Sequence, residues 1–481
     1  MGGFFGVVSY DNCTPDLYLG IDYHSHLGTK LGGMAVYNSD TGWDRSIHHL
    51  ANAPFQTKFE SALDNMKGHI GIGCISDTDA QPLVVKSRFG TFAIVTVGRI
   101  NNEEALASRM LQVNDGYFLE NEKDCVNATE LAAMLINEKN SIAEGIRYAQ
   151  EQFDGSMSML VAYRKGIYCG RDLYGRTPMV IAKKENGDYC VSLESSAYQN
   201  LGYKTEKVLG PGEVVFVGEK SAQPGLIQLI EKKKPEKEKK VCAFLWAHYG
   251  CPTSNYEGIN VEETRMKIGQ ELADADQGQI DDIDSVSGLS DSSVAAAIGY
   301  AERSGKPFRR VLMKNTLIWP RGFKPADQKV LGHIAHMQLI PNKDLIEGKK
   351  LLIIDDSIAC GAKMKETAAL LFKNGAKEVH VRTVCPPVLY GCRYIKFSRY
   401  TSEADLIARR VILELENGQV PSENRLQQYV QEGTDEHKKM VDQICRQMHV
   451  TSLKYPTLDM LVKAIGLKED ELCTYCWTGR D

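Results

Sequence analysis

Two adjacent carboxylates follow directly after an apolar run in the segment KKLLIIDDSIACGAKMKE, residues 349–366. The run ends in Asp355 and Asp356, a short loop containing Gly361 follows, and a helical pattern then continues through Phe372. Carboxylates in this place can bind ribose hydroxyls or a divalent metal, while loop N–H groups and the helix N-terminus face a 5′-phosphate. An Asp or Ser that only caps a helix is the other interpretation of this segment taken by itself.

The cysteines are the second group of residues with possible chemistry. The chain contains thirteen of them, an odd number that extends from Cys13 to Cys476. In a reducing compartment such residues are thiols, metal ligands or cluster ligands rather than a disulfide framework. The pair Cys473-x-x-Cys476, considered alone, fits zinc, redox and cluster roles equally well.

The composition is that of an ordinary globular protein of two or three domains. The 481 residues are 43% hydrophobic and 25% charged, with 57 basic against 62 acidic side chains and a net charge of -5. This balance gives no global positive field for nucleic acid, and no apolar run approaches the roughly 18 residues of a membrane helix. The N-terminus lacks the basic flank and apolar core of a signal peptide, so we expect a cytoplasmic protein without nucleic-acid or membrane partners.

Residues 1–230 have the pattern of a mostly β domain. Short runs rich in β-branched and aromatic residues recur between Gly and Asn turns, with a helical stretch around Glu130–Asn137. The strand candidates are FFGVVSY, GMAVYN, TFAIVTVG, MSMLVAY and EVVFVG. The lysine-rich segment EKKKPEKEKK lies within residues 231–241 and is typical of a solvated linker.

After the linker, strand and helix patterns alternate, which favours βαβ units and a parallel sheet. Helices are expected at Asn260–Ala273 and up to Ala301, and strands at Ile283–Val286, Lys349–Ile354 and Val379–Val384. From about Ser402 the chain is polar and helical. We therefore expect an α/β domain at 242–400 and a helical C-terminal segment at 401–481.

The order of motifs along the whole chain resembles the glutamine phosphoribosyl diphosphate (PRPP) amidotransferases, the amidophosphoribosyltransferase family of purine biosynthesis. MGGFFG resembles the family's MCGIFG start, and HLGTKLGGMAV resembles its HRGQDSAGIAV segment. EGINVEETRMKIGQELA is similar to its hallmark helix, VSGLSDSSVAAAIGYAERSGKP to its PDSG-type loop and helix, and Asp355–Gly361 to its PRPP loop. The resemblance implies an N-terminal-nucleophile-type four-layer α/β/β/α sandwich, followed by a type I phosphoribosyltransferase domain with a parallel sheet and a helical C-terminus.

In this family a cysteine releases ammonia from glutamine, and the ammonia displaces pyrophosphate at C1 of PRPP. The matching nucleophile position is Gly2, which offers no thiol, and Cys13 lies too far along the chain to replace it. The segments that hold a carboxylate-binding Arg and an oxyanion-hole Asn match Gly73–Ser76 and Val97–Arg99, which lack both. Loss of an oxyanion donor alone costs about 100–1000-fold, so we expect no catalytic residue and no glutamine hydrolysis in this domain. The turn RDLYGRTP matches the family's DPxGxRP and is expected to fix a buried turn of the sandwich.

The transferase half keeps part of the PRPP site that the resemblance implies. Ala362 and Lys363 stand where the family has hydroxyls, although loop amides remain and Lys363 offers a charge. Compared with the family, cations that would lie near the pyrophosphate are missing at Thr316 and in Ala335–Leu339. The cations of Pro320–Lys324 are out of register with those of the family. Both differences weaken the stabilisation of the leaving group. The implied PRPP-binding residues are Lys314, Asp355, Asp356, Ser357, Ile358, Ala359, Cys360, Gly361, Ala362 and Lys363, and those implied for Mg²⁺ are Asp291, Ser292, Asp355 and Asp356.

Four cysteines match the ligands of the family's iron–sulfur branch. CTYCWTG resembles its CxxCFTG ending, and Cys242 and Cys392 match its first and second ligands. The resemblance thus implies a [4Fe–4S] cluster on Cys242, Cys392, Cys473 and Cys476, with structural zinc as the alternative for the same four thiolates. Such a cluster would pin the C-terminal helices to the transferase domain in a structural or oxygen-sensing role. Cys360 and Cys385 are expected to be core thiols.

Two functions are consistent with these residues. The first is a phosphoribosyltransferase that makes 5-phosphoribosylamine from PRPP and ammonia, without glutamine hydrolysis. The second is a non-catalytic paralogue that binds PRPP or purine nucleotides in a regulatory or scaffolding role, with an authentic amidotransferase or another ammonia source as a possible assembly partner. A different acceptor for the same PRPP loop is a third option that no residue identifies. The resemblance also implies a homo-oligomer.

Overall fold

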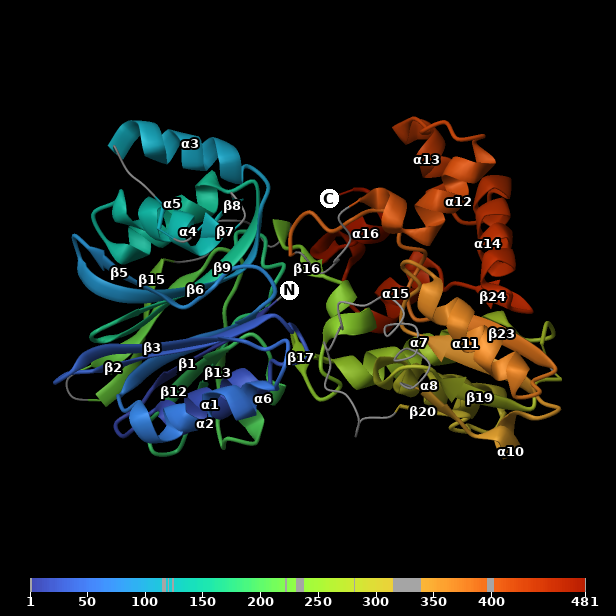
Figure 1. The fold of residues 1–481 in the computed structure, drawn as a ribbon, viewed down its shortest axis with the longest axis horizontal. Coiled ribbons are helices and arrows are strands. Elements are labelled where there is room, and N and C mark those ends of the chain that lie inside the picture. Colours follow the sequence, from blue (N-terminus) through green and yellow to red (C-terminus); the bar gives the residue numbers. More distant parts are fainter. Residues whose placement is uncertain are drawn as a thin grey trace.

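The computed structural model describes residues 2–114, 118–119, 121–122, 125–220, 223–230, 238–280, 282–314, 339–395 and 402–480. Two lobes lie side by side, the first built from the N-terminal part of the chain and the second from the C-terminal part (Figure 1). Both termini lie near the junction of the lobes in this view. The charged segment 231–237 between the domains falls outside the described residues.

The first lobe contains two antiparallel sheets. Its strands are β1 (Gly3–Val8), β2 (Leu31–Asn38), β3 (Gly42–His49), β4 (Ile70–Ser76), β5 (Leu83–Ser87), β6 (Gly90–Ile100), β9 (Gly155–Tyr163), β10 (Gly166–Gly170), β11 (Val180–Lys183), β12 (Tyr189–Ser192), β13 (Lys204–Val208), β14 (Val214–Lys220) and β15 (Gln223–Ile230). The strand order is β13-β11-β12-β1-β4-β2-β3 in one sheet and β15-β14-β10-β9-β6-β5 in the other. A further short pair joins β7 (Asn121–Glu122) and β8 (Cys125–Val126).

Helices cover the outer faces of the two sheets. They are α1 (Thr14–Asp22), α2 (Phe55–Asn65) and α6 (Ser196–Gln199) on one side, and α3 (Glu103–Asn114), α4 (Ala128–Asn137) and α5 (Ile142–Gln152) on the other. The result is the expected four-layer α/β/β/α sandwich (Figure 1). The inner layer is apolar, since side chains such as Phe4, Val95 and Leu160 point between the sheets and are fully buried.

Local sequence explains these elements. Each of the five strand candidates coincides with a strand, namely β1, β2, β6, β9 and β14, so those predictions are confirmed. The predicted helix around Glu130–Asn137 is α4, which begins where the Asn127 side chain accepts the N–H groups of Thr129 and Glu130.

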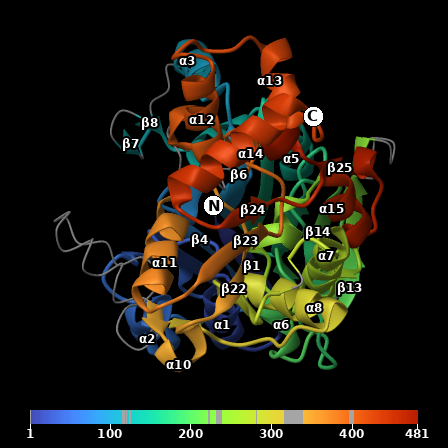
Figure 2. The same ribbon diagram turned by 90° about the vertical axis from the view of Figure 1, so that its right-hand side faces the viewer.

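The second lobe contains a parallel sheet of order β19-β22-β23-β24. These strands are Ser285–Gly288, Lys350–Asp355, Glu378–Thr383 and Ser452–Lys454. In Figure 2 the sheet lies between α11 (Ala362–Lys373) on one side and α7 (Val261–Ala275) and α8 (Val294–Ser304) on the other. The predicted helices and strands of this domain are therefore present, although the first strand begins two residues later than Ile283.

The C-terminal segment is helical, as expected, and it also completes the parallel sheet. Its helices are α12 (Ile407–Leu415), α13 (Glu423–Val430), α14 (Asp435–Met448), α15 (Leu458–Ile465) and α16 (Tyr475–Thr478). Strand β24 lies between α14 and α15 and pairs with β23. A strand of three residues is too short for a two-residue periodicity to reveal it.

Short elements complete the second lobe. They are β16 (Val241–Cys242), η2 (Leu245–Tyr249), β17 (Asn255–Tyr256), β18 (Ile259–Asn260), η3 (Asp291–Ser293), β20 (Leu312–Lys314), β21 (Leu339–Pro341), α10 (Lys343–Ile346), η4 (Glu403–Asp405), η5 (Glu469–Glu471) and β25 (Leu472–Cys473).

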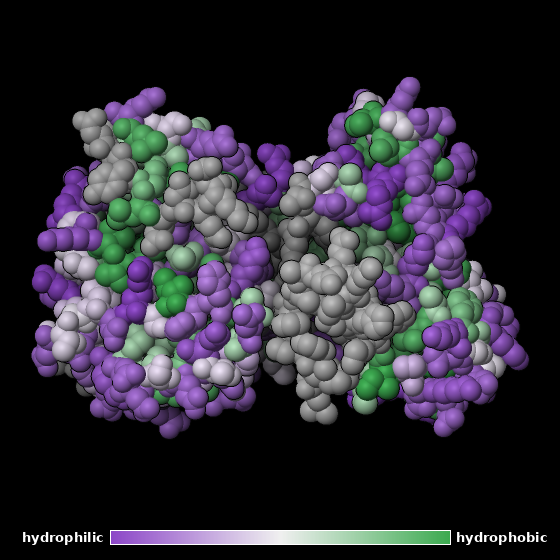
Figure 3. All heavy atoms as spheres, viewed as in Figure 1, coloured by the Kyte–Doolittle hydropathy of each residue, from purple (hydrophilic) through white to green (hydrophobic). Residues whose placement is uncertain are grey.

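Hydrophilic side chains cover most of the described surface on the face shown in Figure 3. Within the described residues, no helix combines the length and the apolar character needed to cross a membrane.

A buried carboxylate joins the two lobes. Glu194 of the first lobe is fully buried, and its carboxylate lies 2.9 Å from His26 Nε2. It also accepts hydrogen bonds from the backbone N–H of Cys251 at 3.2 Å and from the Tyr256 hydroxyl, both in the second lobe. Burial alone would raise the pKa of Glu194, but the charge and hydrogen bond of His26, with smaller contributions from His24 and Tyr256, lower it to about 2.

This carboxylate predicts a loss of stability in acid. A lowered pKa in the folded state stabilises the protein above pH 4.5, the ordinary value, and the stabilisation is lost as the pH falls towards 2. We expect the free energy of unfolding to fall by about 3 kcal/mol more in the wild type than in Glu194→Gln between pH 5 and pH 2. Urea unfolding at a series of pH values measures this difference. Parallel pH profiles for the two proteins would contradict it.

Candidate functional site

The two predicted carboxylates lie at the carboxyl end of a central strand of the parallel sheet. Asp355 ends β22 and Asp356 follows it, with 3% and 5% of their surfaces exposed. A loop from Ser357 leads to α11, and Gly361 caps this helix with a φ of 79°, a conformation that glycine adopts without strain. The strand-loop-helix geometry predicted from the sequence is therefore present.

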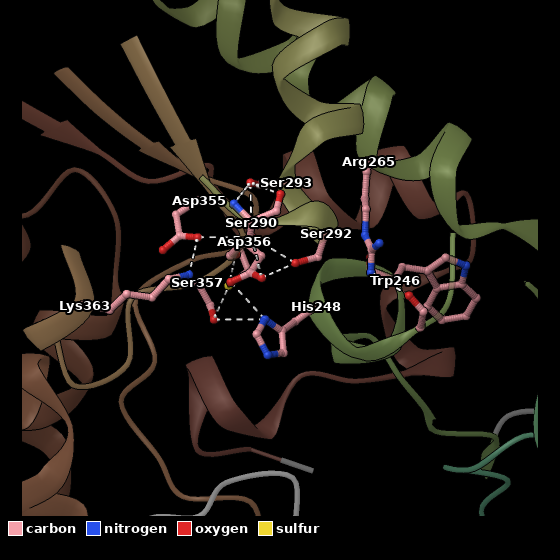
Figure 4. Close-up of polar contacts among 12 residues, drawn as sticks. Trp246, His248, Arg265, Ser290, Ser292, Ser293, Asp355, Asp356, Ser357 and Lys363 are labelled. Atoms are coloured by element: carbon pink, nitrogen blue, oxygen red, sulfur yellow. Dashed lines mark hydrogen bonds and ion pairs between the residues drawn. The ribbon is translucent and has the colours of Figure 1, made fainter. Parts of the chain in front are cut away.

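Asp356 is surrounded by hydrogen-bond donors from three segments. His248 Nδ1 lies 3.0 Å from its Oδ1, and the Ser290 hydroxyl donates to its Oδ2 at 3.0 Å. The Ser292 hydroxyl also donates to Oδ2, and Figure 4 shows these side chains pointing toward one another. Burial alone would raise the pKa of Asp356, but the charge of His248 and these hydrogen bonds hold it well below its usual range.

Asp355 has weaker partners. Ser290 Oγ donates to its Oδ1 at 3.3 Å, and Lys363 Nζ lies 3.5 Å from the same oxygen. Burial raises the pKa of Asp355, because Lys363 compensates only part of the cost of a charged carboxylate in this place. Burial would lower the pKa of Lys363, but Asp355 and then Asp356 raise it, so the lysine stays charged. The pair therefore holds one carboxylate that is firmly ionised and one that takes up a proton more readily.

A cavity of about 200 Å³ opens beside the pair. The loop Ser357–Gly361 and Lys363 form one wall, which carries the phosphate-binding features predicted from the sequence. The remaining lining residues are Phe244, His248, Tyr249, Asp355, Asp356, Met364, Val388, Tyr390, Cys392 and Cys476. A polar end with carboxylates and a cation thus faces an aromatic end, a combination that suits a phosphorylated sugar or a nucleotide.

The sequence-predicted metal residues are only partly together. Ser292 and Asp356 are in contact, but Asp291 has a side chain that is 64% exposed and lies 3.9 Å from Lys314 Nζ. No group of three or more His, Cys, Asp or Glu side chains in the described part of the chain is arranged to hold a metal ion. Mg²⁺ is commonly held by one or two carboxylates together with substrate phosphates, and the Asp355 and Asp356 oxygens fit that kind of site.

Several predicted positions lie outside the described residues. These are Thr316, Pro320–Lys324 and Ala335–Gln338, where the predicted cations of the pyrophosphate site are missing or out of register.

Two residues of the site were missed from the sequence. His248 lies in η2, about a hundred residues before the aspartates, and no spacing connects the two segments. Ser290 lies one residue before Asp291 in the loop that was singled out, so its position could have been found. Both contact Asp356, which makes them part of the site that receives a ligand.

The four predicted cluster cysteines converge at the other end of the cavity. Cys242 on β16 stands opposite Cys473 on β25 in a parallel pair, and Cys392 shares a hydrogen bond with Cys476. Cys392 and Cys476 also line the cavity described above. The carbonyl of Cys476 accepts the N–H groups of Leu389 and Tyr390, so the C-terminal turn is fastened to the segment before Cys392.

Four cysteine thiolates can bind either a [4Fe–4S] cluster or a structural zinc ion. Burial raises the pKa of Cys242, and the hydrogen bond with Cys392 raises the pKa of Cys476, so both thiols would release a proton on binding a metal.

The other cysteines differ in exposure. Cys385 is buried and burial raises its pKa, as expected of a core thiol, whereas Cys360 in the phosphate loop is only half-buried.

The site that would hold glutamine in the first domain is closed. A Cβ on Gly2 would lie 2.2 Å from the carbonyl oxygen of Ile75, and a Cβ on Gly98 would lie 1.9 Å from that of Ser156. The cavity left between these segments has a volume of about 20 Å³, room for about one water molecule, and is bordered by Ile395 of the second domain. An added side chain at Gly2 or Gly98 would therefore require the neighbouring backbone to shift, and the space between these segments is small.

Known proteins resemble the chain in sequence and in fold. The sequence profile of a glutamine amidotransferase domain matches residues 69–200. Amidophosphoribosyltransferase of Methanocaldococcus jannaschii is 28% identical over 100% of this chain and 97% of the relative, and that of Bacillus subtilis is 25% identical over 99% and 93%. The chain is thus similar to amidophosphoribosyltransferases over nearly its whole length.

Solved structures show the same fold. Glutamine PRPP amidotransferase from Bacillus subtilis, complexed with ADP and GMP, superposes with a TM-score of 0.81 at 24% identity, covering 99% of this chain and 96% of that one. A structure described as the allosteric regulatory enzyme of purine biosynthesis gives a TM-score of 0.82 at 23% identity, covering 99% and 95%. The N-terminal-nucleophile sandwich followed by a type I phosphoribosyltransferase domain is thus the fold of this chain.

The closed pocket predicts that a cysteine cannot restore glutaminase activity. Gly2→Cys should release no glutamate from glutamine, because its Cβ forces the backbone of Ile75 aside, and it should cost about 1–3 kcal/mol of stability. Gly2→Ala adds the Cβ without the sulfur and should be destabilised equally. Glutamate formation is measured in protein shown by mass spectrometry to have lost Met1. Release above the level of Gly2→Ala would contradict the prediction.

Proposed function

We propose that this chain is a phosphoribosyltransferase that forms 5-phosphoribosylamine from PRPP and free ammonia, in the setting of purine biosynthesis. The observation that carries the proposal is the buried pair Asp355–Asp356, which lines one cavity together with the phosphate loop. The closed pocket at Gly2 and Gly98 supports the second half of the proposal, the loss of glutamine hydrolysis.

The arrangement of the site assigns roles to its residues. The carboxylates of Asp355 and Asp356 accept hydrogen bonds from the two ribose hydroxyls, which must replace the present bonds from Ser290 and Ser292. The loop amides before α11 bind the 5′-phosphate, aided by the charge of Lys363. These contacts hold C1 of the sugar in place, which lowers the entropic part of the barrier.

The reaction is a substitution at C1. The nitrogen of ammonia forms a bond to C1 while the bond between C1 and the pyrophosphate oxygen breaks. The departing oxygen keeps the electron pair, and the new amine loses one proton to solvent. Mg²⁺ carried by the pyrophosphate and the aspartates would neutralise the charge of the leaving group.

The proposal predicts an ammonia-dependent activity. Anaerobically purified protein should release pyrophosphate from PRPP and Mg²⁺ when ammonia is added, and should stay at background with glutamine. Asp356→Asn should lower the rate about 100-fold or more, because it removes the charge that orients the ribose. Asp344→Asn, on an exposed residue at the start of α10, is the control and should keep the wild-type rate.

Either of two outcomes would refute the proposal. No release above background with ammonia would exclude the transferase activity. Release with glutamine as efficient as with ammonia would show that the first domain still supplies the nitrogen.

A second function is favoured by one observation, the aromatic end of the cavity. Phe244, Tyr249 and Tyr390 are among its lining residues, and aromatic rings can stack on a base. A non-catalytic protein that binds a purine nucleotide there, alone or as a partner of an authentic amidotransferase, would show saturable nucleotide binding in calorimetry without pyrophosphate release.

We further propose that the four convergent cysteines hold a [4Fe–4S] cluster. Bound there, a cluster would cross-link the segments of Cys242, Cys392 and Cys473–Cys476 and would make the protein sensitive to oxygen.

This proposal predicts the metal content. Anaerobically purified protein should contain about four iron and four sulfide per chain, since each of the four thiolates binds one iron. Cys473→Ser should lose most of the iron. Cys445→Ser, on a half-buried cysteine outside the set, should retain it. About one zinc per chain in the wild type, without iron, would instead assign a structural zinc site.

A further inference from the structure

The last residues of β6 reach across from the first domain to the segment of Cys392. Arg99 Nη1 donates to the carbonyl oxygen of Cys392 at 2.8 Å, and Asn101 Nδ2 donates to that of Arg393 at 3.1 Å. Arg99 belongs to the stretch that resembles the oxyanion segment of the amidotransferases. The segment Val97–Arg99 therefore lies where the resemblance places it, but the Arg99 side chain donates its hydrogen bond to the second domain.

A second arginine of the first domain contacts the same region. Arg176 is 1% exposed, and its guanidinium carbon lies 3.8 Å from the centre of the Tyr394 ring. Its carbonyl oxygen accepts the N–H of Cys242 at 3.1 Å. The turn RDLYGRTP thus does more than fix the sandwich, because it also holds the strand that carries the first of the four cysteines.

The segment after Cys392 also fills what is left of the closed pocket. Ile395 is 1% exposed and borders the small cavity beside Gly2 and Gly98. Contacts of the first domain are therefore made with residues 392, 393, 394 and 395 in succession. Contacts with four successive residues fix the position of this segment against the first domain.

Contacts within the second domain hold part of the cysteine group, since β16 pairs with β25 and the carbonyl of Cys476 accepts the N–H groups of Leu389 and Tyr390. The first domain adds a charged hydrogen bond from Arg99 to the carbonyl of Cys392 and a backbone hydrogen bond from Cys242 to the carbonyl of Arg176. The placement of Cys392 and Cys242 therefore has a contribution from the first domain.

We propose that Arg99 and Arg176 form a clamp by which the former glutaminase domain positions the cysteine segments of the second domain. Arg99 is a positioning residue for Cys392, and Arg176 is one for Cys242 and Tyr394. The inference requires neither the transferase reaction nor a bound cluster, since it concerns the placement of the thiols in the metal-free chain.

The test is thiol alkylation of the full-length, metal-free protein, followed residue by residue with mass spectrometry. Arg99→Ala should raise the alkylation rate of Cys392 about 10-fold, the opening factor expected for the loss of one charged hydrogen bond. Cys190, buried in the core of the first domain, should react as in the wild type. Arg99→Lys keeps one donor and should react at an intermediate rate, which a merely space-filling role would not predict.

Arg88→Ala is the matched control. Arg88 lies between β5 and β6 of the same domain, with its guanidinium 5.1 Å from the centre of the Phe89 ring and away from the clamp. It should leave the reactivity of Cys392 unchanged. Equal rates for Cys392 in the wild type and in Arg99→Ala would overturn the proposal.

If Arg99→Ala unfolds the first domain, Cys190 will react quickly too, and Asn101→Ala then decides. That variant removes the bond to the carbonyl of Arg393 alone. Faster alkylation of Cys392 with Cys190 still protected supports the clamp, and unchanged alkylation of both refutes it. This test does not depend on the cluster proposal, because alkylation rates can be compared in protein that binds no iron.

Discussion

Two buried carboxylates side by side at the end of β22 are the constraint on which the second domain depends. Like charges at this distance inside a protein are unfavourable unless other groups compensate them. His248 and two serines compensate Asp356, whereas Lys363 compensates Asp355 only in part. Three segments consequently meet at this carboxylate pair. They are the loop before α11, the serine loop after β19 and η2. A ligand with two hydroxyls and a phosphate would complement this arrangement. Its hydroxyls would donate to the carboxylates, and its phosphate would bind the loop.

The first domain shows what remains of an enzyme site when its side chains are lost and its backbone is kept. The framework glycines Gly2 and Gly98 still allow the close approach of strands, but no larger residue fits there now. The same sheet places Arg99 and Asn101 against the second domain. The sandwich therefore has a structural role as well, because it supports the segment that carries Cys392 and borders the cavity.

Much of this could be predicted from the sequence, for identifiable reasons. The strands β1, β2, β6, β9, β14 and β22 are long apolar runs, and the loop after Asp356 carries its chemistry in adjacent residues, so local patterns were sufficient. The contacts of His248 with Asp356 and of Arg99 with Cys392 join residues far apart in the sequence, and no local pattern encodes them. The three-residue strand β24 is too short to show a period. The order of the cysteines was informative only through a resemblance, since spacing alone does not distinguish a cluster from zinc.

The central claim is that the Asp355–Asp356 pair and the loop of α11 still bind PRPP. Calorimetric titration of anaerobically purified protein with PRPP in the presence of Mg²⁺ tests it directly, with ribose 5-phosphate as the ligand that lacks pyrophosphate. The account predicts saturable binding of PRPP that Asp355→Asn weakens, and weaker binding of ribose 5-phosphate through the same loop. No binding of either ligand by folded wild-type protein would contradict it.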